Sequence, residues 1–227
     1  MADQPRAAQR GLETPLRFFC AIFVAIRSIA HEGSAPMASK YLTRKRAYEK
    51  WESPDRIYAQ LESEASDRAV ALIAGGFLED QIAITIEHFF VDISEPDVGK
   101  LFHGLGPLAG FYGKIIMGFA LGIFGPKTRE DLETISHIRN EFAHNSDAID
   151  FDSEQIKTLC RKLHFPEKIP EALRTHYIDE TKKMGRTPHK RNRNDYVSTV
   201  GMIHQGLFIT RWFAPPLRQR MQAMIRD

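Results

Sequence analysis

The segment from Ser66 to about Phe90 constrains the fold of this 227-residue chain more than any other. Its apolar residues recur at roughly helical spacing, from Ala69 through Phe77 to Ile84, which is typical of a long helix with a buried face. Elsewhere in the sequence, no stretch shows sustained alternation of apolar and polar residues bounded by hairpin turns. We therefore predict an all-α fold, a compact multi-helix bundle with this segment central to its core.

Cap and break signals divide the rest of the chain into further helices. In chain order, we expect a helix after Ser53-Pro54, one from Ser94 to His103, and an almost wholly apolar one from Leu108 to Gly125-Pro126. Two more helices should follow, one capped by Thr128 and one capped by Asp152 or Ser153. The last two expected helices are one that ends at Met184 and one from Tyr196 to Phe213. The helix capped by Thr128 should place Glu130 and Asp131 in its first turn, near the positive end of the helix dipole. Its expected core residues are Leu132, Ile135, Ile138 and Phe142.

Pro166 and Pro170 mark the clearest break in the chain, so we place a boundary there. Residues 37–170 form the predicted helical domain. Residues 171–227 form a predicted C-terminal helical extension, which contains a basic loop and docks on the same core. Residues 1–36 are predicted to be an N-terminal extension outside the core, because Met37 opens a polar stretch that reads like a protein start.

The composition, 43% hydrophobic and 26% charged, is that of an ordinary globular protein. A net charge of +2 gives no whole-molecule attraction to nucleic acid or to an anionic membrane. The apolar run from Phe18 to Ile26 is too short to span a bilayer. Cys20 and Cys160 lack the neighbouring ligands that a zinc site needs. We therefore predict a cytoplasmic protein with reduced thiols, no membrane span, no metal and no cofactor.

The string from Ile138 to His144 contains the residues with the clearest chemical potential. Arg139 could bind phosphate oxygens with its fork of donors, and His144 could act as an acid or base because it titrates near neutral pH. Five residues of an ideal helix turn through about 140°, so these two side chains would not share one face. The alternative is structural: His144 caps the last turn, and Arg139 pairs with a carboxylate elsewhere.

Asp67, Arg68, Glu79 and Asp80 are polar residues within an otherwise apolar helical segment. Paired carboxylates can bind a cation or perform acid-base chemistry. A solvated helix face, or internal ion pairs from the acids to Arg68 and Arg139, is the simpler interpretation. No further His or carboxylate cluster lies at metal-ligand spacing.

The segment from residue 182 to residue 193 is basic and contains no acid. A basic loop of this kind can contact nucleic-acid phosphates without reading bases. The candidate nucleic-acid-binding residues are Lys182, Lys183, Arg186, Lys190, Arg191 and Arg193. A solvated loop that balances acids elsewhere is the alternative, because the segment contains no aromatic residue for stacking.

Three strings, taken together in their order and spacing, resemble the mannitol operon repressor family. They are Ser66-Asp67-Arg68-Ala69 leading to Leu78-Glu79-Asp80, then Gly106-Pro107-Leu108 leading through Lys114-Ile115 to Ala120-Leu121-Gly122, and finally Ile135 to His144. The resemblance covers about residues 58–165. It implies an all-α regulatory protein linked to control of a carbohydrate operon, without an obvious DNA-binding module. The basic C-terminal extension departs from the family pattern, and no helix-turn-helix is evident here.

The Arg-Asn-x-x-x-His string is also similar to the motif of the HEPN superfamily, small helical proteins that include metal-independent ribonucleases. This resemblance would make Arg139 and His144 a catalytic pair assembled across a dimer, with Asn140 as a polar supporter. The string is short, so its specificity is low.

These observations support three functions in a definite order. We expect first a non-enzymatic regulator that acts through contacts with an unidentified protein partner, second a dimeric ribonuclease, and third a protein that binds nucleic acid directly through the basic segment. We also predict a homodimer, because the apolar residues along 108–124 and 196–213 exceed what one small helical core needs.

Overall fold

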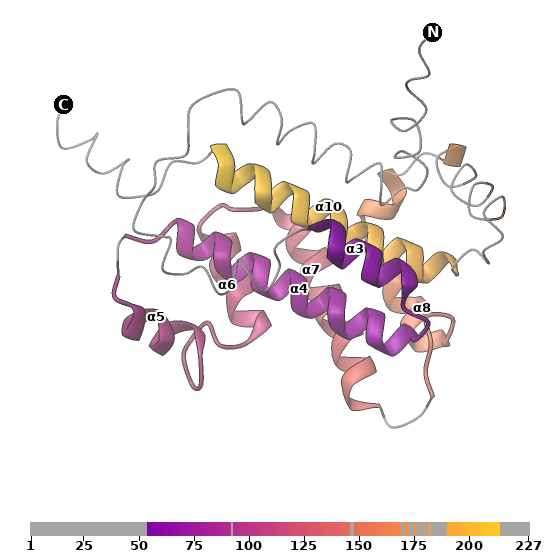
Figure 1. Cartoon of the computed structure of the whole chain (residues 1–227), viewed down its shortest axis with the longest axis horizontal. Coiled ribbons are helices and arrows are strands. Elements are labelled where there is room, and N and C mark those ends of the chain that lie inside the picture. The colour runs from indigo at the N-terminus through magenta and orange to yellow at the C-terminus, as the bar shows by residue number, and fades with distance from the viewer. Residues whose placement is uncertain are drawn as a thin grey trace, which may run out of the picture.

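The computed structural model describes residues 54–91, 93–145, 148–168 and 190–213, together with the single positions 171, 172, 175, 179 and 182. In order, its elements are helices α3 (Pro54–Ser63), α4 (Asp67–His88), α5 (Glu95–Phe102), α6 (Phe111–Ala120), α7 (Pro126–His144) and α8 (Glu154–Cys160), the 3₁₀ helix η3 (Phe165–Lys168), and helix α10 (Arg191–Phe213) (Figure 1). The all-α prediction is confirmed for these residues, which contain no strand. The predictions about residues 1–36, Met37, Cys20 and a helix ending at Met184 fall largely on residues outside this described part.

Helix α4 lies at the centre of the bundle and packs against α10, α7, α6 and α3. The Ser66 hydroxyl caps its N-terminus by accepting a hydrogen bond from the Ala69 N–H at 3.3 Å. Its buried arc is wide because several helices cover it. Leu72 lies on the remaining outward face and is 36% exposed.

Helix α4 is also the one described helix that is long and apolar enough, by length and composition, to cross a membrane. Its most apolar window is 61% buried inside the bundle. A core helix surrounded by other helices passes the same test, so this property carries no further conclusion.

Helix α6 is shorter than the apolar stretch from Leu108 to Gly125 suggested. It ends at Ala120, and the chain turns through Gly122, whose φ of +69° is a conformation that favours glycine. At Gly118 a Cβ atom would lie 2.7 Å from the Phe124 ring. The turn after α6 can therefore fold back closely because both positions lack a side chain.

Helix α7 begins at Pro126 after an N-cap at Gly125, so the predicted cap at Thr128 is wrong. Proline fits the first turn, where its missing N–H would have no helical partner. The earlier start moves Asp131 out of the first turn and into the interior. The predicted core residues Leu132, Ile135, Ile138 and Phe142 are all fully buried.

Helix α10 begins at Arg191, before the predicted start at Tyr196, and runs beside α4 (Figure 1). Tyr196 is fully buried, its ring lies 5.3 Å from that of Phe151, and its hydroxyl donates to the Ala71 carbonyl at 3.0 Å. Cys160 belongs to the same core, and burial raises the pKa of its thiol to about 12. Helix α10 thus shares one hydrophobic core with the helices before it.

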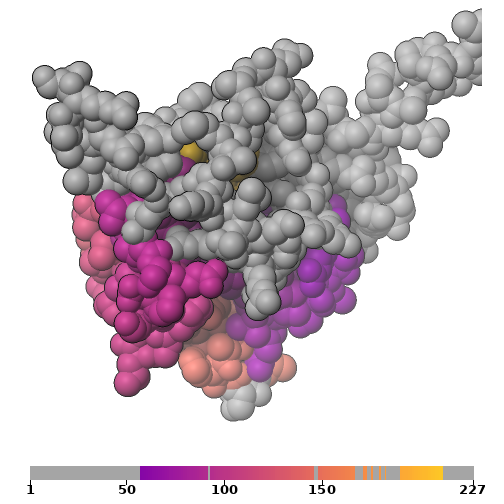
Figure 2. All heavy atoms as spheres, turned by 60° about the vertical axis from the view of Figure 1, so that its left-hand side comes forward, coloured from indigo at the N-terminus to yellow at the C-terminus, as the bar shows by residue number. Residues whose placement is uncertain are grey.

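Helix α5 and the turn after it project from the bundle toward one end (Figure 1), and Figure 2 shows them in magenta at the front of one face. Phe102 anchors this projection, because it is 6% exposed and its ring lies 6.1 Å from that of Phe90. Leu108, at the other end of the turn, is 3% exposed. The projection is therefore held at both ends while its tip faces outward.

Candidate functional site

The first predicted polar pair, at the start of α4, joins three segments of the chain. The Arg68 guanidinium donates to the Asn145 carbonyl at 2.7 Å, which gives a partner to a backbone oxygen at the C-terminal end of α7. The Asp67 carboxylate accepts from the Phe151 N–H at 3.1 Å and pairs with Arg193 at 3.0 Å. Both residues therefore act as cross-links between elements.

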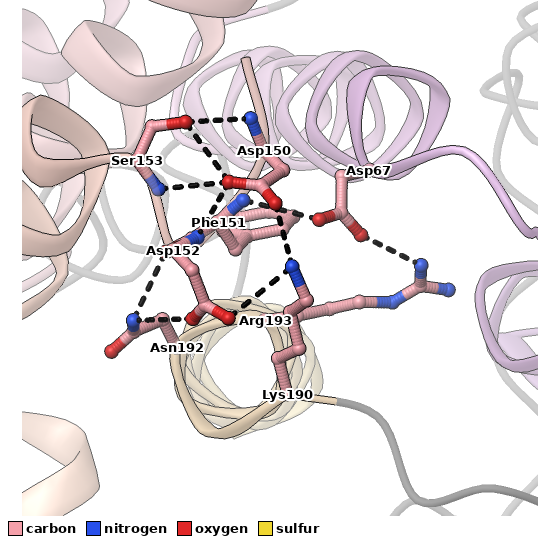
Figure 3. Close-up of polar contacts among 8 residues, drawn as sticks. All are labelled: Asp67, Asp150, Phe151, Asp152, Ser153, Lys190, Asn192 and Arg193. Carbon is pink, nitrogen blue, oxygen red and sulfur yellow. Dashed lines mark hydrogen bonds and ion pairs between the residues drawn. The ribbon is translucent and has the colours of Figure 1, made fainter. Parts of the chain in front are cut away.

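Arg193 is the interior partner of Asp67 (Figure 3). Its side chain is only 4% exposed, and it also donates to the backbone carbonyls of Leu61, at 3.0 Å, and Glu64. A guanidinium at this depth is stable only because each direction meets an acceptor. Arg193 consequently cannot reach nucleic-acid phosphates while this arrangement stands.

Beside it, the turn before α8 holds the N-terminus of α10 (Figure 3). Lys190 pairs with Asp150 at 2.6 Å and with Asp152 at 3.2 Å, and Asn192 donates to the Phe151 carbonyl at 3.0 Å. Asp150 also accepts from the Ser153 N–H and hydroxyl at 2.8 and 2.9 Å. Lys190 is the largest cause that lowers the pKa of Asp150 to about 2.

The second predicted acid, Glu79, is shared by two cations. Lys114 of α6 lies 2.6 Å from one carboxylate oxygen and donates to the Ala109 carbonyl at 3.0 Å, while Arg139 of α7 lies 3.2 Å from the other oxygen. The Lys114 and Glu79 side chains are 8% and 13% exposed. A Cβ at Gly75 would lie 3.0 Å from Arg139, so glycine makes room for its stem. Of the interpretations considered for these acids, an internal ion pair to Arg139 is the one found at Glu79.

Asp80, the neighbour of Glu79, is half-buried and turned about 100° away around α4. In the described part of the chain, no group of three or more His, Cys, Asp or Glu side chains is placed to hold a metal ion.

The ribonuclease-like residues lie on one uninterrupted helix, because α7 runs through His144. Asn140 and His144 are exposed, whereas Arg139 turns toward Glu79. The 140° rotation expected from helix geometry therefore separates Arg139 from His144 within one chain. Their convergence across a dimer stays a prediction.

The nucleic-acid candidates are divided between different environments. Lys182 is exposed, and Lys183 and Arg186 lie outside the described residues. Among the other three, Lys190 and Arg193 have the ion pairs given above, and Arg191 is 3.8 Å from Asp195. Lys190, Arg191 and Arg193 are thus each close to an acid of the same chain.

Two buried titratable groups were missed by the sequence reasoning. Asp131 is fully buried. Its Oδ1 accepts from the backbone N–H of His164 at 2.7 Å and from the Nδ1 of the His164 ring at 2.9 Å, while the Oδ2 of Asp131 has no partner in the described structure. His204 of α10 is 3% exposed, and burial, with the charge of Arg211, lowers its pKa to about 3. The Tyr58 hydroxyl lies 3.1 Å from the Nδ1 of His204. No local pattern pairs such distant positions, so the sequence offered no signal for them.

Known proteins place this arrangement in a family. The family model described as mannitol repressor matches residues 53–203. The chain therefore belongs to the mannitol repressor family, and it is a regulatory protein. The match reaches beyond residues 58–165, so the resemblance traced from the three strings was too short: it included no part of α10, of which residues 191–203 lie within the match.

Two solved structures share the fold. One is the X-ray structure of the MtlR–HPr complex from Escherichia coli, with 18% identity, a TM-score of 0.50, and coverage of 67% of this chain and 96% of that chain. The other is a possible transcriptional regulator, YggD, from Shigella flexneri 2a, with 16% identity, a TM-score of 0.52 and the same coverage. No curated protein matches the chain.

Proposed function

We propose that this protein regulates a carbohydrate operon in the cytoplasm by binding a protein partner of the HPr type. The single observation that supports this most is where the polar residues of the family strings lie. Asp67, Arg68, Glu79 and Arg139 bind other parts of the same chain. They hold the bundle together, which leaves recognition to outward-facing residues and favours a binding protein over an enzyme.

The likeness to an MtlR that forms a complex with HPr supports the choice of partner. The nearly complete coverage of that shorter chain means that the shared fold includes almost all of its residues. A partner that recognises the fold of the family would find the corresponding elements here.

Isothermal titration of the full chain with HPr from the same bacterium tests this proposal. We expect saturable binding in the micromolar range, with about one partner per chain. An unrelated protein of similar size and net charge is the control. Absence of both heat and co-elution at about 100 µM of each protein would refute the proposal.

We further propose that the protein is a homodimer. The observation that favours this is the apolar surface left outside the core between residues 105 and 121. Light scattering coupled to size-exclusion chromatography should give twice the chain mass of 25.9 kDa. A mass of one chain at about 50 µM would count against the dimer.

A further inference from the structure

Exposed apolar side chains are concentrated in one stretch of the described residues. The seven large ones are Leu72, Val91, Leu105, Tyr112, Ile116, Leu121 and Ile209. Four of the seven lie between residues 105 and 121. Single exposed hydrophobic residues are ordinary, but a concentration of them marks an interaction surface.

Helix α6 contributes the regular part of this surface. Tyr112 is 62% exposed, Ile116 is 36% exposed, and Ala120 is exposed. A spacing of four residues places all three on one outward face. The opposite side, with Phe111 and Ile115, is buried in the bundle. This almost wholly apolar helix is therefore only partly buried within one chain.

Leu105 forms a fixed apolar tip on the turn that leads into α6. Its side chain is fully exposed, with a relative exposure of 105%. Gly104 has a φ of +61°, and at Gly106 a Cβ would lie 2.2 Å from the Lys100 carbonyl oxygen, so both positions favour glycine. The Leu108 N–H closes the turn by donating a hydrogen bond to the Leu101 carbonyl at 2.9 Å. Because the backbone that presents Leu105 is already held, covering this side chain does not require a loop to become ordered.

Three of the four Lys and Arg residues between residues 97 and 133 have an acidic partner within the chain. Lys114, the single charged residue of α6, points inward to Glu79. Lys100 pairs with Asp97 at 2.9 Å, and the Arg129 guanidinium pairs with Glu133 at 2.8 Å. In addition, Arg129 lies 5.0 Å from the centre of the Phe119 ring beside the outward face.

A neutral apolar face suits a second copy of the same chain better than a charged partner. A two-fold contact brings each surface against an identical one, so charged residues near the axis would repel their own kind. Tyr112, Ile116 and Ala120 contain no such charge. An acidic protein or an anionic membrane would instead need free cations. Of the three cations other than Lys114 in this stretch, Lys100 and Arg129 already have acidic partners, and Lys127 is the third.

We infer that Leu105, Tyr112, Ile116 and Leu121, here called the α6 face, form the contact between two copies of this chain. This inference rests on the homodimer proposed above and assigns its surface. Each Leu105 would insert against the other copy, and the two α6 helices would pack through Tyr112 and Ile116.

Light scattering of surface variants tests the assignment. Tyr112→Ser with Ile116→Ser, and separately Leu105→Ser, should raise the dimer dissociation constant at least about tenfold. The control Ile209→Ser changes a side chain of similar exposure on α10 and should leave the constant unchanged. Circular dichroism should show an unchanged helical content, because all of these residues are exposed.

Cross-linking provides a second readout that does not depend on weakening the contact. In a Cys20→Ser background, Ile116→Cys should form a covalent dimer on mild oxidation, because a residue near a two-fold axis meets its own copy. Ile209→Cys should remain monomeric under the same conditions. The buried Cys160 does not interfere, since its thiol is 3% exposed.

The outcomes separate the inference from the proposal on which it rests. A monomeric wild type refutes the homodimer, and the α6 face with it. A dimer that survives the Tyr112, Ile116 and Leu105 changes refutes only the face. Binding to phosphatidylglycerol vesicles that is lost in Leu105→Ser and in Lys127→Ala would overturn the inference in favour of a membrane surface.

Discussion

Replacing Arg193 with alanine is expected to lower the free energy of unfolding by about 3 to 4 kcal/mol. The change leaves the Asp67 carboxylate, 15% exposed, without its cation. It also removes the donors to two backbone carbonyls, those of Leu61 and Glu64. The remaining donor to Asp67 is the Phe151 N–H.

The magnitude follows from the burial of both partners. Breaking a buried ion pair from one side costs about 3–5 kcal/mol, because the other charge is left without compensation. The Phe151 N–H and the small exposure of Asp67 place the value in the lower half of this range. For a chain of this size such a loss lowers the melting temperature by on the order of 10 °C.

Urea unfolding followed by circular dichroism measures the effect, and Arg191→Ala is the matched control. Arg191 lies two positions away on the same helix, is 74% exposed, and is 3.8 Å from Asp195. Exposed pairs contribute about 0–1 kcal/mol, so this variant should be close to wild type. Arg193→Met combined with Asp67→Asn should recover part of the loss, because no buried charge remains. Equal stability of Arg193→Ala and Arg191→Ala would show that the reasoning is wrong.

Three further results are expected. Glu79→Ala should cost about 3 kcal/mol in thermal or urea unfolding because it strands the buried Lys114. Glu133→Ala breaks a pair with Arg129 in which both side chains are about one third exposed, so it should cost no more than about 1 kcal/mol. Because the pKa of His204 is lowered in the folded state, only the unfolded chain takes up this proton as the pH falls below the ordinary pKa of histidine. The free energy of unfolding should therefore rise by about 2 kcal/mol between pH 5 and pH 7. The His204→Gln variant should show a smaller rise over the same pH range. Single-stranded RNA should remain intact with purified protein and a chelator; cleavage that disappears in His144→Ala would establish the ribonuclease alternative instead.

The sequence predicted the fold class and the two central helices because their signals are local. The apolar period and the Ser66 cap are read within one segment, and the same holds for Leu132 and Phe142 on α7. The start of α7 was wrong because two local signals compete, and proline at position 126 begins the helix before Thr128 can cap it. Helix boundaries are where such signals are weakest.

The start of α10 and the role of Arg193 could not be predicted, since both depend on distant contacts. Arg193 and Asp67 are 126 residues apart, and a basic residue in a basic segment gives no sign of which acid it meets. The first residues of α10 lack an apolar pattern, yet they are helical and Arg193 is buried. Tertiary pairing therefore overrides the local reading of residues 191–193 as a solvated loop.

The acids of α4 also explain why the family strings describe an architecture. Asp67 near one end of α4 requires Arg193 of α10, and Glu79 requires Lys114 of α6 and Arg139 of α7. A helix that docked in another register would leave one of these carboxylates buried without a cation, which costs more than a misplaced apolar contact. We interpret these pairs as fixing how three helices dock around α4. The residues that recognise a protein partner must then be sought among outward-facing residues other than the α6 face, which we assign to the contact between two copies of the chain.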